Sequence, residues 1–368
     1  MHKLTSWILG EESVIRRLPP RPPEIRQPSY LEQFDDRTLI YDAFRDPSGL
    51  HAILIGPPLH NLTPLFDQMA VTNPETGAPL AFSIAHWDRN AQIWIECGSA
   101  AQRLRLSGIP RGSRDLPLQP NHADLFAGRR VVVTMSKDNE LAWIFDWARF
   151  HQRAHGAEGF LLYDNASTKY SLADIQDTLD RAAPGARCVV VSWPFKFGPH
   201  GGPALVWDSD YCIYGMIEHA RWRYLAQARC VLRIDVDEFV ISPNRASVFA
   251  STEASPLGYL QFVGCWIVNE HAATRLARHR DFKYRERTPT ATKNWCVAPQ
   301  RCTFEQQWRN HAILGFPEQL VSEDRFMHRH FKAINTSWKF QRFHPVAIDP
   351  KLHVVDHVLV EQLAEFLG

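Results

Sequence analysis

The chain lacks any long apolar run: no stretch approaches the roughly 18–20 consecutive apolar residues that a membrane-spanning helix needs. The amino-terminal segment, Met1 to Leu18, is interrupted by Glu11 and Glu12, and it is too short and wrongly flanked for a secretion signal. We expect it to form a helix packed on the protein, although peripheral contact with a membrane surface stays open.

Paired cysteines and an excess of one charge are also missing. The seven cysteines are scattered and no C-x-x-C pair occurs, so neither a zinc site nor a disulfide framework is indicated. This pattern fits a reducing, cytoplasmic location. The net charge is +1, with 41 Lys and Arg against 40 Asp and Glu. This balance gives no support to a general nucleic-acid binder, and it does not indicate an oligomeric state.

The length of 368 residues exceeds what one ordinary core holds. A proline-rich stretch over residues 19–28 is typical of a stiff connector. Short apolar or alternating segments at 50–55, 80–84, 91–97 and 102–106 are typical of strands. We therefore predict an N-terminal helix and connector over 1–28, a β-rich accessory domain over 29–126, and a catalytic domain over 127–368.

The catalytic region alternates apolar strands with amphipathic helices. Apolar runs at 131–135, 159–163, 187–193 and 230–234 are typical of buried parallel strands. Helical periodicity or capping residues predict helices over 141–155, 172–181 and 210–227. This alternation predicts a Rossmann-like α/β fold, with a mostly parallel central sheet flanked by helices. In such sheets, ligands bind beyond the carboxyl ends of the strands.

A D-x-D motif follows the fourth of these strands. Asp235 and Asp237 are two residues apart, so in an extended conformation their side chains point to the same side. Two like charges at the end of a buried strand need a cation, and a hard divalent metal would complete its shell with substrate phosphates. The motif is short and arises by chance, with a solvated turn as the plain alternative. Its position at a strand end, alongside the polar segments 136–140 and 164–165, favours the metal interpretation.

Four groups of residues occur in one order at sensible spacings. They are Lys137-Asp138-Asn139-Glu140, then Phe145-Asp146-Trp147 with Phe150-His151 and Gly156, then Leu162 to Thr168, and then Ile234 to Phe239. Together they resemble the GT-A-fold glycosyltransferases, most closely glycosyltransferase family 92 and its bacterial family-2-like relatives, over about residues 129–368. The resemblance implies a metal-dependent, inverting transferase. It would move a hexosyl group, with galactosyl as one candidate, from a UDP-sugar to a carbohydrate acceptor in cell-surface polysaccharide or glycan synthesis.

The resemblance also assigns residues of a nucleotide pocket. Thr134, Ser136, Asn139 and Glu140 would line it, and Asp164 would accept hydrogen bonds from the uracil or ribose. Two departures from the family pattern affect its detailed geometry. Asp138 replaces a usual Lys, and Lys169 stands where relatives often carry an Asp.

By the same resemblance, Asp235 and Asp237 would hold Mn²⁺, or Mg²⁺, on the diphosphate, with Asp235 also reaching the nucleotide. His330 is our candidate for a third metal ligand and His328 the alternative, while a hydrogen-bonded structural histidine is the plain interpretation of either. Lys332 could reach the diphosphate as a point charge.

A general base must deprotonate the acceptor hydroxyl in an inverting transfer. Glu270, which follows an apolar run, and Asp324, in a polar loop, are the candidates, although each could be a solvated surface carboxylate. Glu238 points away from Asp235 and Asp237 on an extended strand, so we expect it to pin the local backbone.

Two other functional classes compete with the transferase. A nucleotidyltransferase would carry a Gly-rich phosphate loop after the first strand, and residues 136–140 contain no Gly. A non-catalytic carbohydrate-binding or assembly protein could keep the same fold. Metal-dependent turnover would exclude that class.

Overall fold

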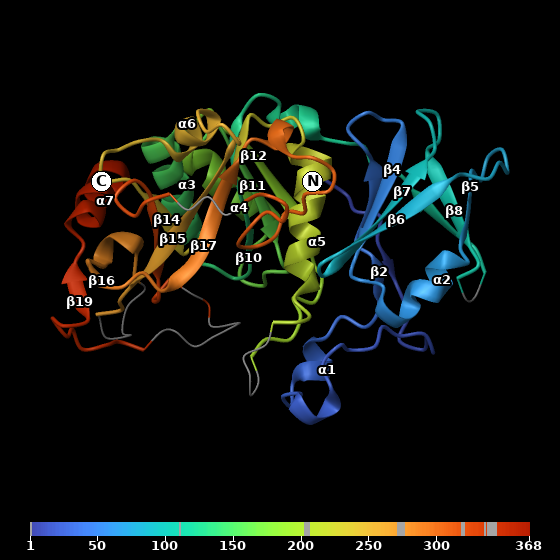
Figure 1. The fold of residues 1–368 in the computed structure, drawn as a ribbon, viewed down its shortest axis with the longest axis horizontal. Coiled ribbons are helices and arrows are strands. Elements are labelled where there is room, and N and C mark those ends of the chain that lie inside the picture. Colours follow the sequence, from blue (N-terminus) through green and yellow to red (C-terminus); the bar gives the residue numbers. More distant parts are fainter. Residues whose placement is uncertain are drawn as a thin grey trace. The chain divides into compact units, whose positions relative to one another are not determined.

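The computed structural model describes residues 2–109, 112–201, 207–270, 277–317, 321–334, 336 and 344–368. The chain forms two compact units (Figure 1). The first contains residues 1–124 together with 194–226, and the second contains residues 125–193 together with 227–368. Among the described residues, no helix has the length and apolar character needed to cross a membrane.

The first unit is built mainly from short antiparallel strands. They form the sheets β1-β2, β3-β4-β7-β6 and β5-β8-β9. The strands are β1 (Trp7–Ile8), β2 (Thr38–Ile40), β3 (Asp42–Arg45), β4 (His51–Gly56), β5 (Ala70–Thr72), β6 (Phe82–Trp87), β7 (Asn90–Glu96), β8 (Arg103–Ser107) and β9 (Arg114–Pro117). The helical elements are η1 (Pro23–Ile25), α1 (Tyr30–Gln33), η2 (His60–Leu62), α2 (Thr63–Asp67), α5 (Tyr211–Ala220) and the π-helical turn η4 (Arg221–Leu225), and η3 (Ala123–Phe126) crosses the division between the units.

The predicted N-terminal helix is wrong. Trp7 and Ile8 instead form β1, which pairs antiparallel with β2. The backbone amide of Leu9 donates to the carbonyl of Arg37, and Trp7 is buried. Pairing with residues 37–40 satisfies the backbone groups of this segment, whereas a short isolated helix would be only marginally stable in water.

The segment 194–226 lies in the first unit, whereas we predicted it within the catalytic domain. Buried polar and charged side chains on α5 and η4 explain the difference. Asp42 Oδ2 lies 3.0 Å from His219 Nε2 and 2.7 Å from Arg223 Nη1. Gln92 Nε2 donates to Glu218 Oε2 at 2.8 Å. Helical periodicity predicted the helix, but it carried no information about which side chains, here Asp42 and Gln92, would pair with these buried groups.

Asp42→Ala is expected to lower the free energy of unfolding by about 3–5 kcal/mol, because it leaves the buried Arg223 guanidinium without its counter-ion. Burial alone would raise the pKa of Asp42, but the hydrogen bond from His219 and the charge of Arg223 hold it below its usual value. Urea unfolding measures the loss. Asp115→Ala removes the exposed partner of Arg105 in the same unit and should change stability little. Equal effects of the two substitutions would contradict this account.

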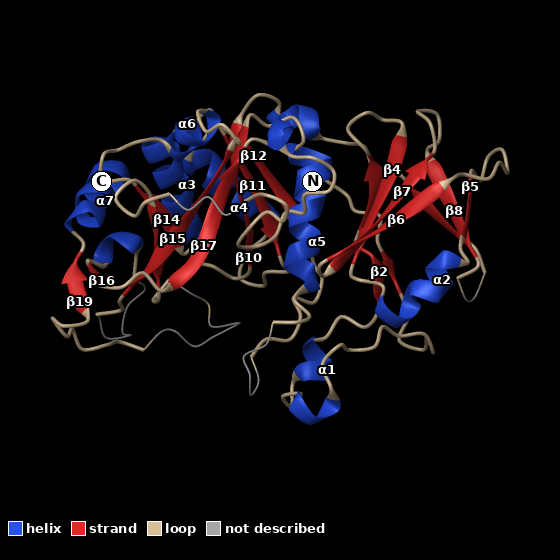
Figure 2. Ribbon diagram, viewed as in Figure 1, coloured by secondary structure: helices blue, strands red, loops and turns tan. Residues whose placement is uncertain are grey.

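The second unit contains the predicted α/β sheet (Figure 2). Its ten strands run in the order β12-β11-β10-β13-β17-β15-β16-β19, and β18 pairs with both β15 and β14. The strands are β10 (Arg130–Ser136), β11 (Gly159–Asp164), β12 (Arg187–Ser192), β13 (Cys230–Arg233), β14 (Glu238–Ile241), β15 (Tyr259–Ile267), β16 (Tyr284–Glu286), β17 (Ala291–Val297), β18 (Met327–Phe331) and β19 (His353–Val355). The helical elements are α3 (Leu141–His155), α4 (Leu172–Ala182), α6 (Val248–Glu253), η5 (His279–Asp281), η6 (Pro299–Arg301) and α7 (His357–Leu367).

The predicted parallel strands are confirmed for β10 to β13, which pair with one another in parallel, while β13 also pairs antiparallel with β17. Apolar side chains of α3 and α4, including Trp147 and Leu179, pack with Phe160 and Leu162 of β11 in one buried core. Helix α4 begins at Ser171 with a capping box, as its sequence predicts. Helix α3 ends at Gly156, whose φ of 72° only glycine adopts without strain.

Two buried histidines of α3 predict how stability depends on pH. His151 Nδ1 lies 2.8 Å from the carbonyl of Trp147, and His155 Nε2 lies 2.8 Å from that of Val240. Burial lowers the pKa of His151 to about 3 and that of His155 to about 4. Both values lie below the unfolded-state pKa of about 6.5. The unfolded chain therefore binds more protons as the pH falls below about 6.5, and stability is lost progressively towards pH 4.

We expect urea unfolding to give a lower free energy at pH 5 than at pH 7.5. His155→Gln keeps a donor towards Val240 but does not titrate, so it should show a shallower dependence over this range. The same pH dependence in both proteins would contradict the role of His155.

Candidate metal and nucleotide site

Parallel pairing gathers four of the predicted residues at one edge of the sheet. Ser136 pairs with Asp164 at the carboxyl ends of β10 and β11. Thr134 Oγ1 lies 3.4 Å from Asp235 Oδ1, beyond the end of β13. Residues separated by about 100 positions in sequence therefore lie at the edge where α/β sheets bind ligands.

The loops after β10 and β11 are fixed to one another. Asp138 Oδ1 accepts hydrogen bonds from the amides of Thr168 at 2.7 Å and Lys169 at 3.1 Å, and the amide of Asp138 donates to Ser167 Oγ at 2.8 Å. Asp138 and Ala166 have φ values of 52° and 57°, a conformation that is uncommon for residues other than glycine and that concentrates at functional sites. Asp138 thus joins the two loops.

Asn139 and Glu140 have partners within these loops. Asn139 Nδ2 donates to Ser136 Oγ at 2.9 Å. Lys169 Nζ lies 2.6 Å from Glu140 Oε1. Asp138 and Lys169, the two residues that differ from the expected pattern, therefore have structural roles here. Asp138 joins the two loops, and Lys169 neutralises Glu140, the carboxylate predicted to line the nucleotide pocket.

Asp164 presents an acceptor at this edge. Its Oδ2 accepts from the amide of Ser167 at 3.1 Å, whereas its buried Oδ1 has no hydrogen-bond partner among the described residues. Burial raises the pKa of Asp164. A buried acceptor without a partner is costly, so a donor N–H or O–H of a bound ligand would stabilise this position.

Asp235 is held by a basic residue that our sequence analysis did not identify. Arg233 Nη2 lies 2.9 Å from Asp235 Oδ1, and the Arg233 side chain is fully buried. Arg233 ends β13, and Asp235 lies two residues beyond it. The extended D-x-D that we expected is not formed, because residues 236–237 form a turn in which the amide of Glu238 donates to the carbonyl of Asp235 at 3.0 Å. The Asp235 side chain remains 28% exposed.

Asp237 and His330 come together from segments 93 residues apart. Asp237 Oδ2 lies 3.0 Å from His330 Nε2. Antiparallel pairing of β14 with β18 places Glu238 opposite His330, and parallel pairing of β15 with β18 places Trp266 beside it. The Trp266 and His330 rings stack with their centroids 4.1 Å apart. The predicted association of His330 with the D-x-D motif is therefore present in the structure.

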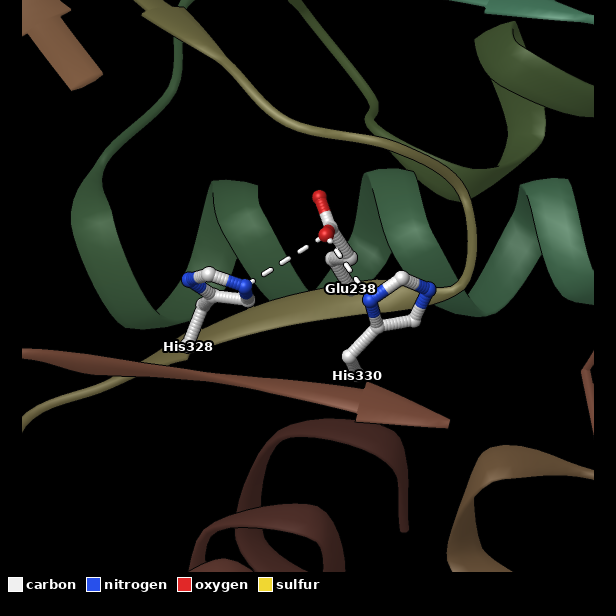
Figure 3. Close-up of side chains that lie close together, drawn as sticks. All are labelled: Glu238, His328 and His330. Carbon is white, nitrogen blue, oxygen red and sulfur yellow. Dashed lines mark ion pairs between the residues drawn. The ribbon is translucent and has the colours of Figure 1, made fainter. Parts of the chain in front are cut away.

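Glu238 organises the residues around it (Figure 3). Its Oε2 accepts from the amide of Asp235 at 3.0 Å and from Asn294 Nδ2 at 2.7 Å. Its Oε1 lies 3.2 Å from His330 Nδ1 and 3.4 Å from His328 Nε2. Burial alone would raise the pKa of Glu238, but His328, His330 and Arg233 hold it well below its usual value. Glu238 thus pins the D-x-D backbone, and it also orients His330.

Two sets of side chains around His330 could bind a metal. Glu238, His328 and His330 bring three ligand atoms within 4.8 Å of one another, all from buried residues. His328 fills space that the missing side chain of Gly264 leaves, since a Cβ there would lie 2.1 Å from its Nε2. Two imidazoles and one carboxylate suit Zn²⁺ better than Mn²⁺.

The second set is Asp235, Asp237 and His330, whose two carboxylates and one imidazole suit Mn²⁺ better. Asp237 and His330 are in contact at 3.0 Å, whereas Asp235 pairs with Arg233, so these three ligand groups do not converge as those of the first set do. The side chains of Asp235 and Asp237 are 28% and 20% exposed, whereas Glu238 and His328 are buried. The second set is therefore the more accessible of the two to a diphosphate. His330 Nδ1 lies 3.2 Å from Glu238 Oε1, and Nε2 faces Asp237, an arrangement similar to metal sites in which an outer carboxylate orients a histidine.

The remaining predicted residues lie around this centre. Lys332, just beyond β18, pairs with Glu286 at 2.6 Å and lies 5.5 Å from the Trp266 ring. Glu270 is half-buried and follows the carboxyl end of β15, which pairs alongside the His330 end of β18. Asp324 is exposed in a turn before the other end of β18. The pairing of β15 with β18 therefore brings Glu270 towards the site more readily than Asp324.

A cavity of about 360 Å³ lies in the same unit. Its lining includes Tyr259, Gln261, Lys293, His311 and Phe316. Because Trp295 of β17 pairs with Arg233, Lys293 lies two residues further along, towards the level of Asp235. Burial, with the charge of Arg233, lowers the pKa of His311 to about 4, so this ring is neutral at pH 7. No local sequence signal indicated His311.

Neither a protein-family model nor a curated protein matches this chain. Similar solved structures include the galactosyltransferase LgtC with donor and acceptor sugar analogues, at 17% identity and a TM-score of 0.25. That similarity covers 47% of this chain and 58% of LgtC, so the chain spans just over half of that protein. The bifunctional glycosyltransferase WbbM is similar at 14% identity and a TM-score of 0.23, over 37% of this chain and 23% of WbbM. At such low TM-scores, these similarities do not decide the activity of this chain.

Proposed function

We propose that the chain is a metal-dependent glycosyltransferase that moves a hexosyl group from a UDP-sugar to a carbohydrate acceptor. The observation that carries the proposal is the approach of Asp237 and His330 to 3.0 Å, at the carboxyl edge that also holds Thr134, Asp164 and Asp235. A solvated turn after β13 would not require a histidine from β18 or the buried carboxylate of Glu238 behind it. An inverting outcome and a galactosyl donor are the narrower parts of the proposal.

In this site, Asp235, Asp237 and His330 would hold Mn²⁺ or Mg²⁺. When bound, the metal would neutralise negative charge on the departing nucleoside diphosphate. Asp164 would accept a hydrogen bond from the nucleoside through its buried Oδ1. Glu238 would keep the His330 ring oriented, and Trp266 would support one face of it.

Glu270 is our first candidate for the base that accepts the acceptor proton, because it follows the strand that pairs beside His330. Asp324 is the second candidate, and its exposed turn lies near the other end of β18. Lys332 would have to break its ion pair with Glu286 before it could place positive charge on the diphosphate.

Release of UDP from a panel of UDP-sugars tests the activity, because many transferases slowly hydrolyse their donor without an acceptor. We expect release from one sugar in Mn²⁺ or Mg²⁺ and none in EDTA. Mn²⁺-dependent turnover would also exclude a non-catalytic binding role. If no UDP-sugar releases UDP and UDP shows no metal-dependent binding, the UDP-sugar assignment is wrong.

His328→Gln distinguishes the two sets of metal ligands. If Asp235, Asp237 and His330 hold the metal, the variant should bind Mn²⁺ with an affinity within a few-fold of wild type, as measured by the loss of the free Mn²⁺ signal in electron paramagnetic resonance. If Glu238, His328 and His330 hold it, Mn²⁺ binding should fall at least tenfold. The second result would move the metal into the buried cluster.

A further inference from the structure

The first unit contains a cavity of about 610 Å³ that the proposed transferase site does not use. Three segments line it: the loop and η2 after β4, the β6–β7 hairpin, and the chain leading into α5. All three belong to the first unit, whereas Asp237 and His330 belong to the second. The volume lies within the range of about 300–1,000 Å³ that is typical of pockets for small organic ligands.

Aromatic rings form part of its wall. Trp87, Trp207 and Tyr211 line the cavity. The Trp207 ring stacks on His200 with centroids 5.9 Å apart, and Tyr211 Oη lies 2.9 Å from His60 Nε2. Contacts with His200, outside the lining, and with His60, within it, therefore hold two of the rings in place. Fixed aromatic faces bury large apolar areas at little entropic cost, and they suit the C–H faces of sugar rings.

Planar polar groups stand beside these rings. Asp88, Arg89, Asn90 and Asp208 line the same cavity. Arg89 Nη1 lies 2.7 Å from Asp210 Oδ1, and Asp208 Oδ2 lies 2.8 Å from Arg21 Nε. Carboxylate, amide and guanidinium groups can each bond two neighbouring hydroxyls. Such groups next to aromatic faces match the chemistry of a polyhydroxylated ring.

The charge of the lining disfavours an anionic ligand. In and next to the lining, the three carboxylates of Asp88, Asp208 and Asp210 outnumber the two guanidinium groups of Arg89 and Arg21 that pair with them. Burial lowers the pKa of His60, so this ring adds no positive charge at pH 7. A phosphate or uronate would meet net negative charge, whereas an uncharged saccharide would not.

The backbone of the lining is unusual at two positions. His60 and Arg89 have φ values of 49° and 60°, and they are two of five non-glycine residues with positive φ in the described parts of the chain. Asp138 and Ala166 of the proposed nucleotide loops are two others. Such conformations persist where the surroundings enforce them, and they cluster at ligand sites.

We propose that the cavity bounded by Trp87, Trp207 and Tyr211 is a binding site for a neutral saccharide. The sugar would pack against the aromatic rings and bond through its hydroxyls to Asp88, Asn90 and Asp208. The inference does not depend on the transferase activity, because every residue that carries it lies in the first unit.

Binding of the full chain to an array of neutral and uronic-acid-containing oligosaccharides tests the proposal, followed by calorimetry with the strongest neutral oligosaccharide. We expect binding to neutral members, with at least about a tenfold weaker affinity for Trp87→Ala. Trp94→Ala is the matched control, since Trp94 lies on β7 in the same unit and packs on Trp222 at 4.9 Å. It should bind as wild type does.

Thermal unfolding verifies that Trp87→Ala is folded. If it is not, Asp88→Asn provides the test, because it preserves volume at a half-buried position and should also weaken binding. Asp237→Ala should keep the affinity, which separates this cavity from the transferase site. The proposal is overturned if no neutral oligosaccharide binds, if only acidic ones bind, or if the variants of the cavity bind as tightly as Trp94→Ala.

Discussion

Asp237→Ala is expected to reduce metal-dependent UDP release by at least about a hundredfold. Replacement of an outer partner of a metal ligand already costs about 10–100-fold in affinity or activity, and Asp237 would be a direct ligand. Its Oδ2 is the carboxylate oxygen that faces His330 Nε2 at 3.0 Å. UDP release measured over a range of Mn²⁺ concentrations would show the loss, and a shift to higher Mn²⁺ would attribute it to the metal.

Asp177→Ala is a matched control for this prediction. Asp177 lies in the same unit, on the exposed surface of α4, where it pairs with Arg181 one helical turn away. Exposed pairs of this kind contribute little, so the variant should release UDP at the wild-type rate. A rate for Asp237→Ala equal to that of Asp177→Ala would remove Asp237 from the site.

Glu238→Ala is expected to cost about 3–5 kcal/mol of stability, because it leaves buried groups without their partner. The affected donors are the amide of Asp235 and the side chain of Asn294, and the affected rings are those of His328 and His330. Urea unfolding at pH 7.5 measures the cost. A loss below about 1 kcal/mol, as at an ordinary surface site, would contradict the central position of Glu238.

Glu238→Gln separates stability from metal binding. It keeps the shape and one acceptor oxygen, so it should lose less stability than Glu238→Ala. It removes the negative charge that lies 3.2 Å from His330 Nδ1, so we expect a decrease in Mn²⁺ affinity of about 10–100-fold. Unchanged Mn²⁺ affinity in Glu238→Gln would mean that Glu238 supports the fold alone.

Local signals account for the parts of the structure that could be predicted from sequence. The apolar runs before Ser136, Asp164 and Asp235, and the cap at Ser171, depend only on neighbouring residues, and β10, β11, β13 and α4 form there. Parallel pairing then aligns the strand ends, so the gathering of these polar residues follows from topology.

The rest depends on pairings between distant segments. The approach of His330 to Asp237 required β18 to lie between β14 and β15, a register that no local pattern encodes. The inclusion of α5 and η4 in the first unit depends on Asp42, the buried partner of His219 on α5 and of Arg223 on η4. His311 and Arg233 were missed for the same reason, because their roles depend on which charges surround them in the folded chain.

Calorimetric titration of the chain with UDP, in Mn²⁺ and then in EDTA, tests the central claim most directly, because it needs no knowledge of the donor sugar or acceptor. The account predicts binding in Mn²⁺ that is lost in EDTA and lost in His330→Ala. UDP binding of equal affinity in Mn²⁺ and EDTA, or equal affinity of wild type and His330→Ala, would contradict a metal–nucleotide site at Asp237 and His330.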